Sequence, residues 1–197
     1  MISGLSRLPA SPSAIVLDAS VLINILGSGS PADLLAAIGH QLIIPEPTLA
    51  EVSFDPSAKQ PAAARTVELI EAGLLTAVPI LGEAARLFSL LAAEMGDGEA
   101  AAVAYAIETE AFVAIDDRKA RRVALPLIRK EPAFFTLDLL LSDQVVSTCG
   151  KAFALDAVFQ ALVNARMRVP HQYRAALVRL LGPEKAEQCP SLGYKAS

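Results

Sequence analysis

Short apolar runs alternate with longer segments of helical periodicity along the chain. Three runs rich in branched residues predict strands that are buried on both faces, at 14–17, 42–44 and 112–115. A fourth run, 75–80, contains Pro79, which cannot donate to a strand ladder, and it therefore predicts an edge strand. Strands alternating with helices predict an α/β fold with a mostly parallel central sheet and right-handed crossovers.

Helices are predicted between the strands and after them. Their expected ranges are 21–26, 32–38, 47–52, 61–72, 83–94, 99–108, 118–124, 137–148, 152–165 and 171–181. Loops are expected at 53–59 and 96–98, and a short strand near 133–135. We expect three parts: a flexible arm at 1–13, a globular α/β domain at 14–150, and a helical C-terminal extension at 151–197 that is loose from Gly182 onward.

Composition narrows the class of protein. The 197 residues are 53% hydrophobic and only 19% charged, with a mean hydropathy of +0.45, which excludes disorder for most of the chain. No apolar run reaches the roughly 18 residues that a membrane-spanning helix needs. Cys149 and Cys189 lack the spacing of a metal site or a disulfide framework. We therefore expect a cytoplasmic protein with no membrane association.

The charge is unevenly distributed. Residues 1–117 carry a balance of −11 and residues 118–197 a balance of +7, within a net charge of −4. Such asymmetry indicates either a polyanionic partner or pairing within the chain. A basic cluster begins directly after the third strand, and it could contact phosphates or simply form a solvated helix face; its candidate nucleic-acid-binding residues are Arg118, Lys119, Arg121 and Arg122.

Four acidic residues lie in apolar surroundings. Asp18 and Asp116 directly follow two of the predicted strands, so a parallel sheet places both at the same edge. Glu51 lies within a predicted helix, and Glu99 begins another. Each acid alone is equally consistent with a helix cap, a local ion pair or a solvated position. If all four converge, their mutual repulsion favours a hard divalent cation with oxygen ligands, such as Mg²⁺.

Four motifs then resemble those of the PIN domain in order and spacing: VLDASVL at 16–22 followed by Asn24, PEPTLAEV at 45–52, GEAAAVAY at 98–105 and VAIDDRKAR at 113–121. The resemblance is greatest to small prokaryotic PIN proteins, which include the toxin nucleases of toxin–antitoxin pairs. It implies a three-layer α/β/α fold over residues 14–150 and a ribonuclease activity that depends on Mg²⁺ or Mn²⁺.

The same resemblance assigns roles by position. It implies that the catalytic acids are Asp18, Glu51, Glu99 and Asp116. The metal ligands that it implies are Asp18, Glu99, Asp116 and Asp117, with Ser20, Asn24 and Asp97 in support. Two choices stay open, because either Asp97 or Glu99 can be the third acid and either Asp116 or Asp117 the fourth.

The partners implied are an RNA substrate and an antitoxin protein. The apolar positions of 152–165 and 171–181 could cap the domain or form a homodimer, which we favour, with Arg166, Arg168, Arg174 and Arg179 lining a basic groove toward the acids. The alternative to an enzyme is a non-catalytic PIN fold that binds nucleic acid or protein.

Overall fold

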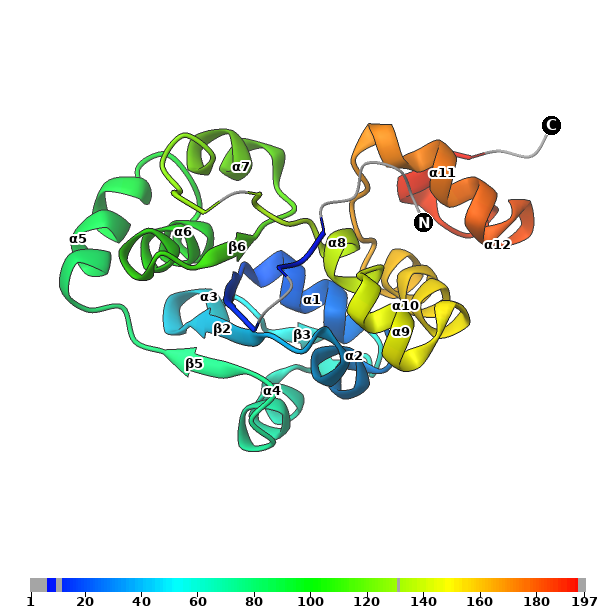
Figure 1. Cartoon of the computed structure of the whole chain (residues 1–197), viewed down its shortest axis with the longest axis horizontal. Helices are drawn as coiled ribbons and strands as arrows, with labels where there is room; N and C mark the ends of the chain where they lie inside the picture. The colour runs from blue at the N-terminus through cyan, green and yellow to red at the C-terminus, as the bar shows by residue number, and fades with distance from the viewer. Residues whose placement is uncertain (1–6, 10–11, 131, 195–197) are drawn as a thin grey trace.

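The central sheet is four-stranded and parallel, as predicted. The computed structural model describes residues 7–9, 12–130 and 132–194. The strands are β1 (Ala14–Leu17), β2 (Gln41–Pro45), β5 (Thr76–Val78) and β6 (Phe112–Ala114), in the spatial order β5-β2-β1-β6 (Figure 1). The strand order reverses between β1 and β6, so the crevice where α/β sheets usually bind ligands lies at the ends of these two strands.

The register of β1 and β6 decides which side each residue faces. Val16 lies opposite Val113, and Leu17 opposite Ala114. Because successive strand residues alternate between faces, Leu17 and Ala114 pack in one core while Val16, Val113 and Ile115 pack in the other. We call the side of Leu17 and Ala114 the first face of the sheet and the side of Val16, Val113 and Ile115 the second. By the same alternation the side chain of Asp116 lies on the first face, and those of Asp18 and Asp117 lie on the second.

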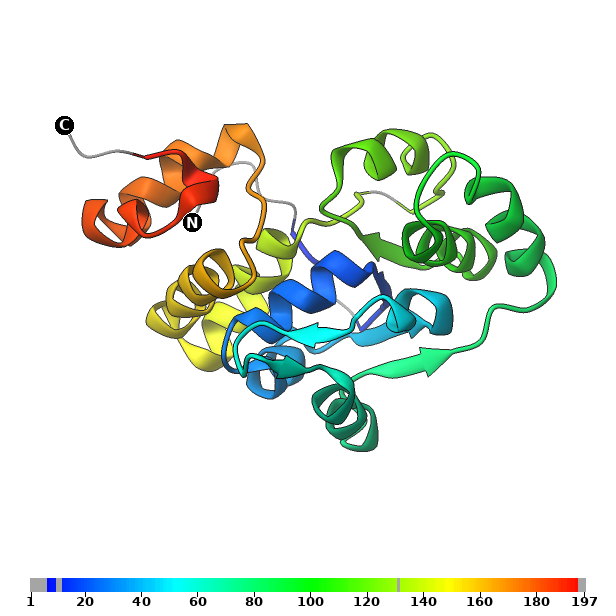
Figure 2. The same ribbon diagram turned by 180° about the vertical axis from the view of Figure 1, so that it is seen from behind.

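Helices cover both faces and complete an α/β/α arrangement (Figure 2). The first face packs against α1 (Ala19–Gly27), α2 (Pro31–Ile38), α4 (Ala63–Glu71), α8 (Thr136–Leu140), α9 (Asp143–Cys149) and α10 (Lys151–Asn164). The second face packs against α5 (Gly82–Leu91), α6 (Asp97–Thr109) and α7 (Arg118–Ala124). Helix α3 (Glu46–Ala50) follows β2 and contacts α6.

Four local expectations are wrong. Residues 53–59 are not wholly a loop, because β3 (Phe54–Asp55) pairs with β4 (Gln60–Pro61). Asp97 and Gly98 belong to the first turn of α6 and not to a loop. The helix expected at 137–148 is two helices, since the Ser142 hydroxyl accepts a hydrogen bond from the Val145 amide and begins α9. The expected strand near 133–135 is a single bridge between Ala114 and Phe134.

The chain after Gly182 is also not loose, contrary to expectation. It forms α12 (Pro183–Glu187) and a 3₁₀ helix (Pro190–Leu192), which follow α11 (His171–Leu181). Ala186, Cys189 and Leu192 recur every third residue, and all three are buried. Three apolar residues are too few for the sequence to predict this helical segment, but in the structure they pack the end of the chain against the larger core.

The C-terminal extension shares its core with the sheet. Ala157, Ala161 and Leu162 of α10 are buried in the same cluster as Leu17 of β1. Helix α10 approaches α1 so closely that a Cβ added at Gly27 would lie 2.7 Å from the Cβ of Ala165. The boundary at 150 stays a prediction, but the extension is packed as an integral part of the fold.

The N-terminal segment lies mostly outside the described residues, namely at 1–6, 10 and 11. Within the expected arm, Leu8 is buried in the larger core, and the Ser13 amide donates to Nδ1 of His40. In the described chain no single helix is long and apolar enough to span a membrane; α1 and α2, bent by 120°, meet the length and composition test only as a pair.

Candidate acidic site

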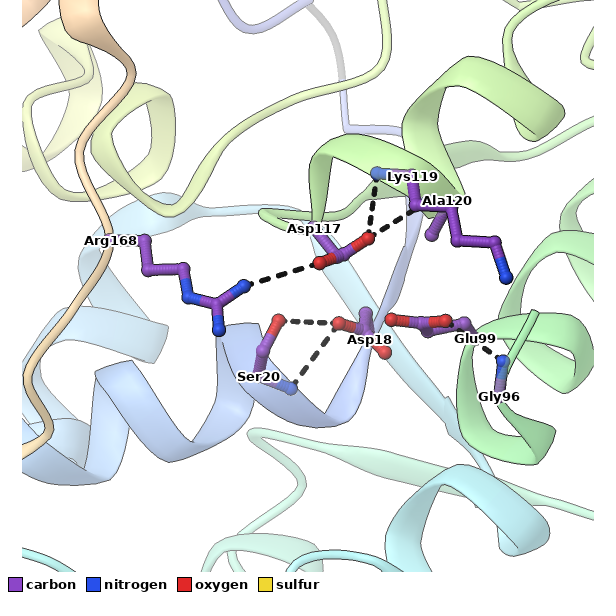
Figure 3. A network of polar contacts seen from close by, with 8 residues as sticks. All are labelled: Asp18, Ser20, Gly96, Glu99, Asp117, Lys119, Ala120 and Arg168. Carbon is purple, nitrogen blue, oxygen red and sulfur yellow. Dashed lines mark hydrogen bonds and ion pairs between the residues drawn. The ribbon is translucent and has the colours of Figure 1, made fainter.

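Three helices begin at the edge of the sheet where β1 and β6 end, and an acidic side chain caps each of them. Asp18 caps α1, Glu99 caps α6 from within its first turn, and Asp117 caps α7. Figure 3 shows the carboxylate of Glu99 next to that of Asp18, whose pKa it raises, and the Asp117 carboxylate directed to the amides of α7 and to Arg168. The positive ends of the helix dipoles partly offset the repulsion among the carboxylates.

Asp18 is the most deeply buried of these acids, with 2% of its surface exposed. The Ser20 hydroxyl and the Ser20 amide, the latter at 3.3 Å, both donate to its Oδ2. Burial raises the pKa of Asp18 from 3.8 to about 6; the Ser20 hydrogen bond opposes this rise and the negative charge of Glu99 adds to it. Asp18 is thus a carboxylate whose charge the surrounding protein does not fully compensate.

Two glutamates meet the N-terminus of α6. The Glu99 carboxylate accepts a hydrogen bond from the Gly96 amide at 3.0 Å, and Glu51, at the end of α3, accepts one from the Gly98 amide at 2.6 Å. A Cβ at Gly98 would lie 2.5 Å from Oε2 of Glu51, so the position must be glycine for this approach. Thr48 donates to the Gly98 carbonyl at 2.7 Å and fixes α3 on α6.

Asp116 lies on the other side of the sheet from Asp18, as the strand register requires. Its Oδ1 accepts from the Thr136 amide at 2.8 Å, and its Oδ2 accepts from the Thr136 hydroxyl at 2.6 Å and from Nδ2 of Asn24 at 2.7 Å. Burial raises the pKa of Asp116, and the hydrogen bonds from Thr136 and Asn24 oppose the rise. These three donors join β6 to α1 and α8.

Asp117 faces the same side as Asp18 and is only partly engaged by its own helix. Its Oδ1 accepts from the amides of Lys119 at 2.7 Å and Ala120 at 3.0 Å. Its Oδ2 contacts the guanidinium of Arg168 at 3.3 Å, which reaches the site from the segment between α10 and α11 (Figure 3).

The basic cluster divides into two kinds of residue. Arg121 is partly buried, stacks 3.6 Å over the ring of Phe135, and donates to the carbonyls of Ile115, Ala133 and Phe134. It therefore holds the end of β6 against the 133–135 segment. The other predicted phosphate contacts, Arg118, Lys119 and Arg122, are exposed.

The site's fit to a metal rests on its donor chemistry. Among the described residues, no three carboxylate, imidazole or thiolate side chains are gathered closely enough to surround an ion. The adjacent pair Asp18 and Glu99 nevertheless offers hard oxygen donors with uncompensated charge. Mg²⁺ is commonly held by one or two carboxylates and several waters, so this pair fits it, and Mn²⁺ likewise. Asp97 is exposed at the first position of α6.

Three residues of the site were missed or not singled out from sequence. Thr136 is 20 residues from Asp116 and gave no signal. Gly98 did carry a sequence signal, since a glycine in the first turn of a helix often marks a position where another group packs closely against the backbone. Arg168 was one of four arginines in the extension that the sequence could not rank.

Comparison with known families identifies the class of protein. A family model described as a PIN domain matches residues 14–183. The chain therefore belongs to the PIN-domain family, whose members are generally nucleases that use divalent metals. The match includes α10 and α11, which are part of the expected extension. No curated protein and no solved structure shows a significant match.

Proposed function

We propose that this PIN-domain protein is a metal-dependent endoribonuclease whose Mg²⁺ or Mn²⁺ is held by Asp18 and Glu99. The observation that carries the proposal is the buried Asp18 carboxylate beside Glu99, with its pKa raised to about 6. A protein that only needed a cap for α1 would not benefit from placing a second negative charge beside it. A bound cation would turn this repulsion into attraction.

The other acids have supporting roles in this proposal. Ser20 orients Asp18 through its two hydrogen bonds. Asp117 borders the Asp18 and Glu99 pair from the start of α7, and Glu51 lies at the N-terminus of α6. Asp116 positions the edge of the sheet through Asn24 and Thr136. Three donors already occupy most of its roughly four acceptor positions, so we assign it a smaller share of the metal than Asp117.

The reaction is hydrolysis of a phosphodiester bond. Water adds to phosphorus, the bond to one ester oxygen breaks, and the products are a phosphate monoester and a hydroxyl group. The divalent cation, when bound, supplies positive charge that stabilises the charge developing on the phosphate. The exposed Arg118, Lys119 and Arg122 bind the RNA backbone beside the site.

Thermal unfolding with and without Mn²⁺ tests the metal site independently of activity. Mn²⁺ should raise the melting temperature of the wild-type protein, because a ligand that binds only the native state stabilises it. The Asp18→Asn and Glu99→Gln variants should lose most of that shift. The matched control is Asp97→Asn, in the same first turn of α6 as Glu99, and it should keep the shift. Equal shifts in all four proteins would contradict the assignment.

Cleavage of single-stranded RNA tests the activity itself. The purified protein should cut RNA with Mg²⁺ or Mn²⁺ and stop with EDTA, and Asp18→Asn should be inactive while still folded. If the wild-type protein binds Mn²⁺ but cuts no RNA, the non-catalytic binding module becomes the better description.

Three finer biological roles are proposals that rest on the sequence: the toxin role on the family resemblance, the location on composition, and the dimer on the apolar helix positions of the extension. They are a cytoplasmic location, a toxin function opposed by an antitoxin protein, and a homodimer. Among the apolar residues expected at a dimer interface, Leu177 is buried in the chain's own core, Phe153 and Phe159 are half-buried against it, and Val163 is 38% exposed. A neighbouring reading frame for a small DNA-binding protein would support the antitoxin, and light scattering measures the oligomeric state.

A further inference from the structure

The segment between α10 and α11 places a positively charged side chain, Arg168, beside the acidic site of its own chain. Met167 and Val169 on either side of Arg168 are 1% and 4% exposed, so the backbone here is anchored in the core. The Met167 amide donates to the Ala161 carbonyl at 3.2 Å, and Arg174 donates to the Val169 carbonyl at 3.3 Å. With its neighbours pointing inward, Arg168 must point outward, toward the ends of β1 and β6.

The contact between Arg168 and Asp117 is too weak to be the reason for this placement. It is a single hydrogen bond of 3.3 Å, and the Arg168 side chain is 80% exposed. Exposed pairs of this kind contribute little to stability. Asp117 also has its own two amide donors in α7 and does not need the arginine as a partner. Most of the five N–H groups of Arg168 face solvent at the mouth of the acidic site.

We propose that Arg168 binds the RNA phosphate at the acidic site, so that the C-terminal extension is part of the substrate-binding surface. The inference rests on the proposed nuclease function and adds a substrate contact to it. An edge lined by Asp18, Glu99 and Asp117 repels phosphate, and a guanidinium that the anchored backbone keeps beside it offsets that repulsion. The planar fork of arginine pairs with two phosphate oxygens at once, and the exposed bond to Asp117 is easily exchanged for them.

Binding of a fluorescent single-stranded RNA, measured without cleavage, tests the proposal. The measurement uses the full chain carrying Asp18→Asn in EDTA and follows anisotropy over a range of NaCl concentrations. Adding Arg168→Gln should weaken binding about tenfold, the value of one charge-assisted hydrogen-bond pair. It should also reduce the slope of log affinity against log salt by about 0.7, the contribution of one phosphate contact on a single strand.

Two controls separate local chemistry from net charge and folding. Arg65→Gln makes the same charge change on α4, which lies at the opposite edge of the molecule in both views (Figures 1 and 2), and it should leave affinity and slope unchanged. Arg168→Lys keeps the charge without the fork and should keep the salt slope while losing part of the affinity. The melting temperature of each variant checks that it is folded.

The outcomes distinguish this inference from the proposed function. If Arg168→Gln binds RNA as the parent does, or if the parent binds no RNA, the proposal is overturned. Unchanged RNA binding with tighter Mn²⁺ binding would identify Arg168 as a counter-charge for Asp117 only. If the arginine effects appear but the wild-type protein cuts no RNA, the phosphate contact stands and the nuclease assignment fails.

Discussion

The two strand-end aspartates are placed by the same local pattern and have opposite surroundings. Asp18 and Asp116 each follow a buried strand, yet the alternation of the sheet sends them to different faces. Asp116 meets three hydrogen-bond donors from Asn24 and Thr136, whereas Asp18 meets Ser20 and a second acid, Glu99. Burial raises the pKa of both carboxylates. Asp116 differs in having three donors that join β6 to two helices, and Asp18 in having a neighbouring negative charge that a bound cation would offset.

Removing the Asp116 carboxylate should produce the largest effect on stability. Asp116→Ala leaves both donors of Thr136 without their acceptor and removes one of the two acceptors of Asn24 Nδ2, which keeps the Thr136 hydroxyl at 3.3 Å. An unsatisfied buried donor destabilises by about 1–3 kcal/mol, so we expect a loss of about 3–4 kcal/mol in the free energy of unfolding. Urea denaturation in EDTA measures it.

Asp116→Asn is the matched control for this loss. It keeps one acceptor oxygen and removes the buried negative charge that raises the pKa of Asp116, so it should lose clearly less stability than the alanine variant. If both variants unfold at the wild-type urea concentration, the three hydrogen bonds do not hold β6 to α1 and α8, and Asp116 returns as a candidate metal ligand.

Asp18→Asn should change stability in the opposite direction. A carboxyl group whose pKa is raised from 3.8 to about 6 in the folded protein destabilises it above pH 6 by up to about 3 kcal/mol. The neutral amide removes this penalty, so the metal-free variant should be more stable than the wild type at pH 7.5. Thermal unfolding in EDTA should show a rise of several degrees.

The pH dependence provides the control. Because the folded-state pKa is the higher one, the wild-type protein gains stability from Asp18 as the pH falls through 6 toward 3.8. From pH 7.5 to 5 that gain is about 1.5 kcal/mol, and the advantage of Asp18→Asn should shrink by the same amount. An advantage that stays constant over this range would mean that the pKa of Asp18 is not raised.

The same comparison shows what the sequence could and could not predict. Asp18 was predictable because an apolar run followed directly by an aspartate identifies a strand end. Which of Asp116 and Asp117 faces the same side as Asp18 was not predictable, since a shift of one residue changes the face and the face depends on pairing with β1. That Glu99 is the acid whose charge acts on Asp18 follows from contacts between α6 and the end of β1, which the sequence alone does not contain. The sheet order and Arg168 depend on contacts distant in sequence, which no local pattern contains.

Gly98 provides the smallest and most selective test, because it separates Glu51 from the rest of the site. In Gly98→Ala the new Cβ would lie 2.5 Å from Oε2 of Glu51, whose side chain is exposed and free to move away. We expect the free energy of unfolding to stay within about 1 kcal/mol of the wild-type value, since alanine also favours the helix. The displaced Glu51 should reduce RNA cleavage as much as Glu51→Gln does, to within a factor of about 2, and the double variant should be no worse than either single one. Additive losses would show that Gly98 acts on the site by another route, and a large loss of stability would identify it as a packing glycine of α6.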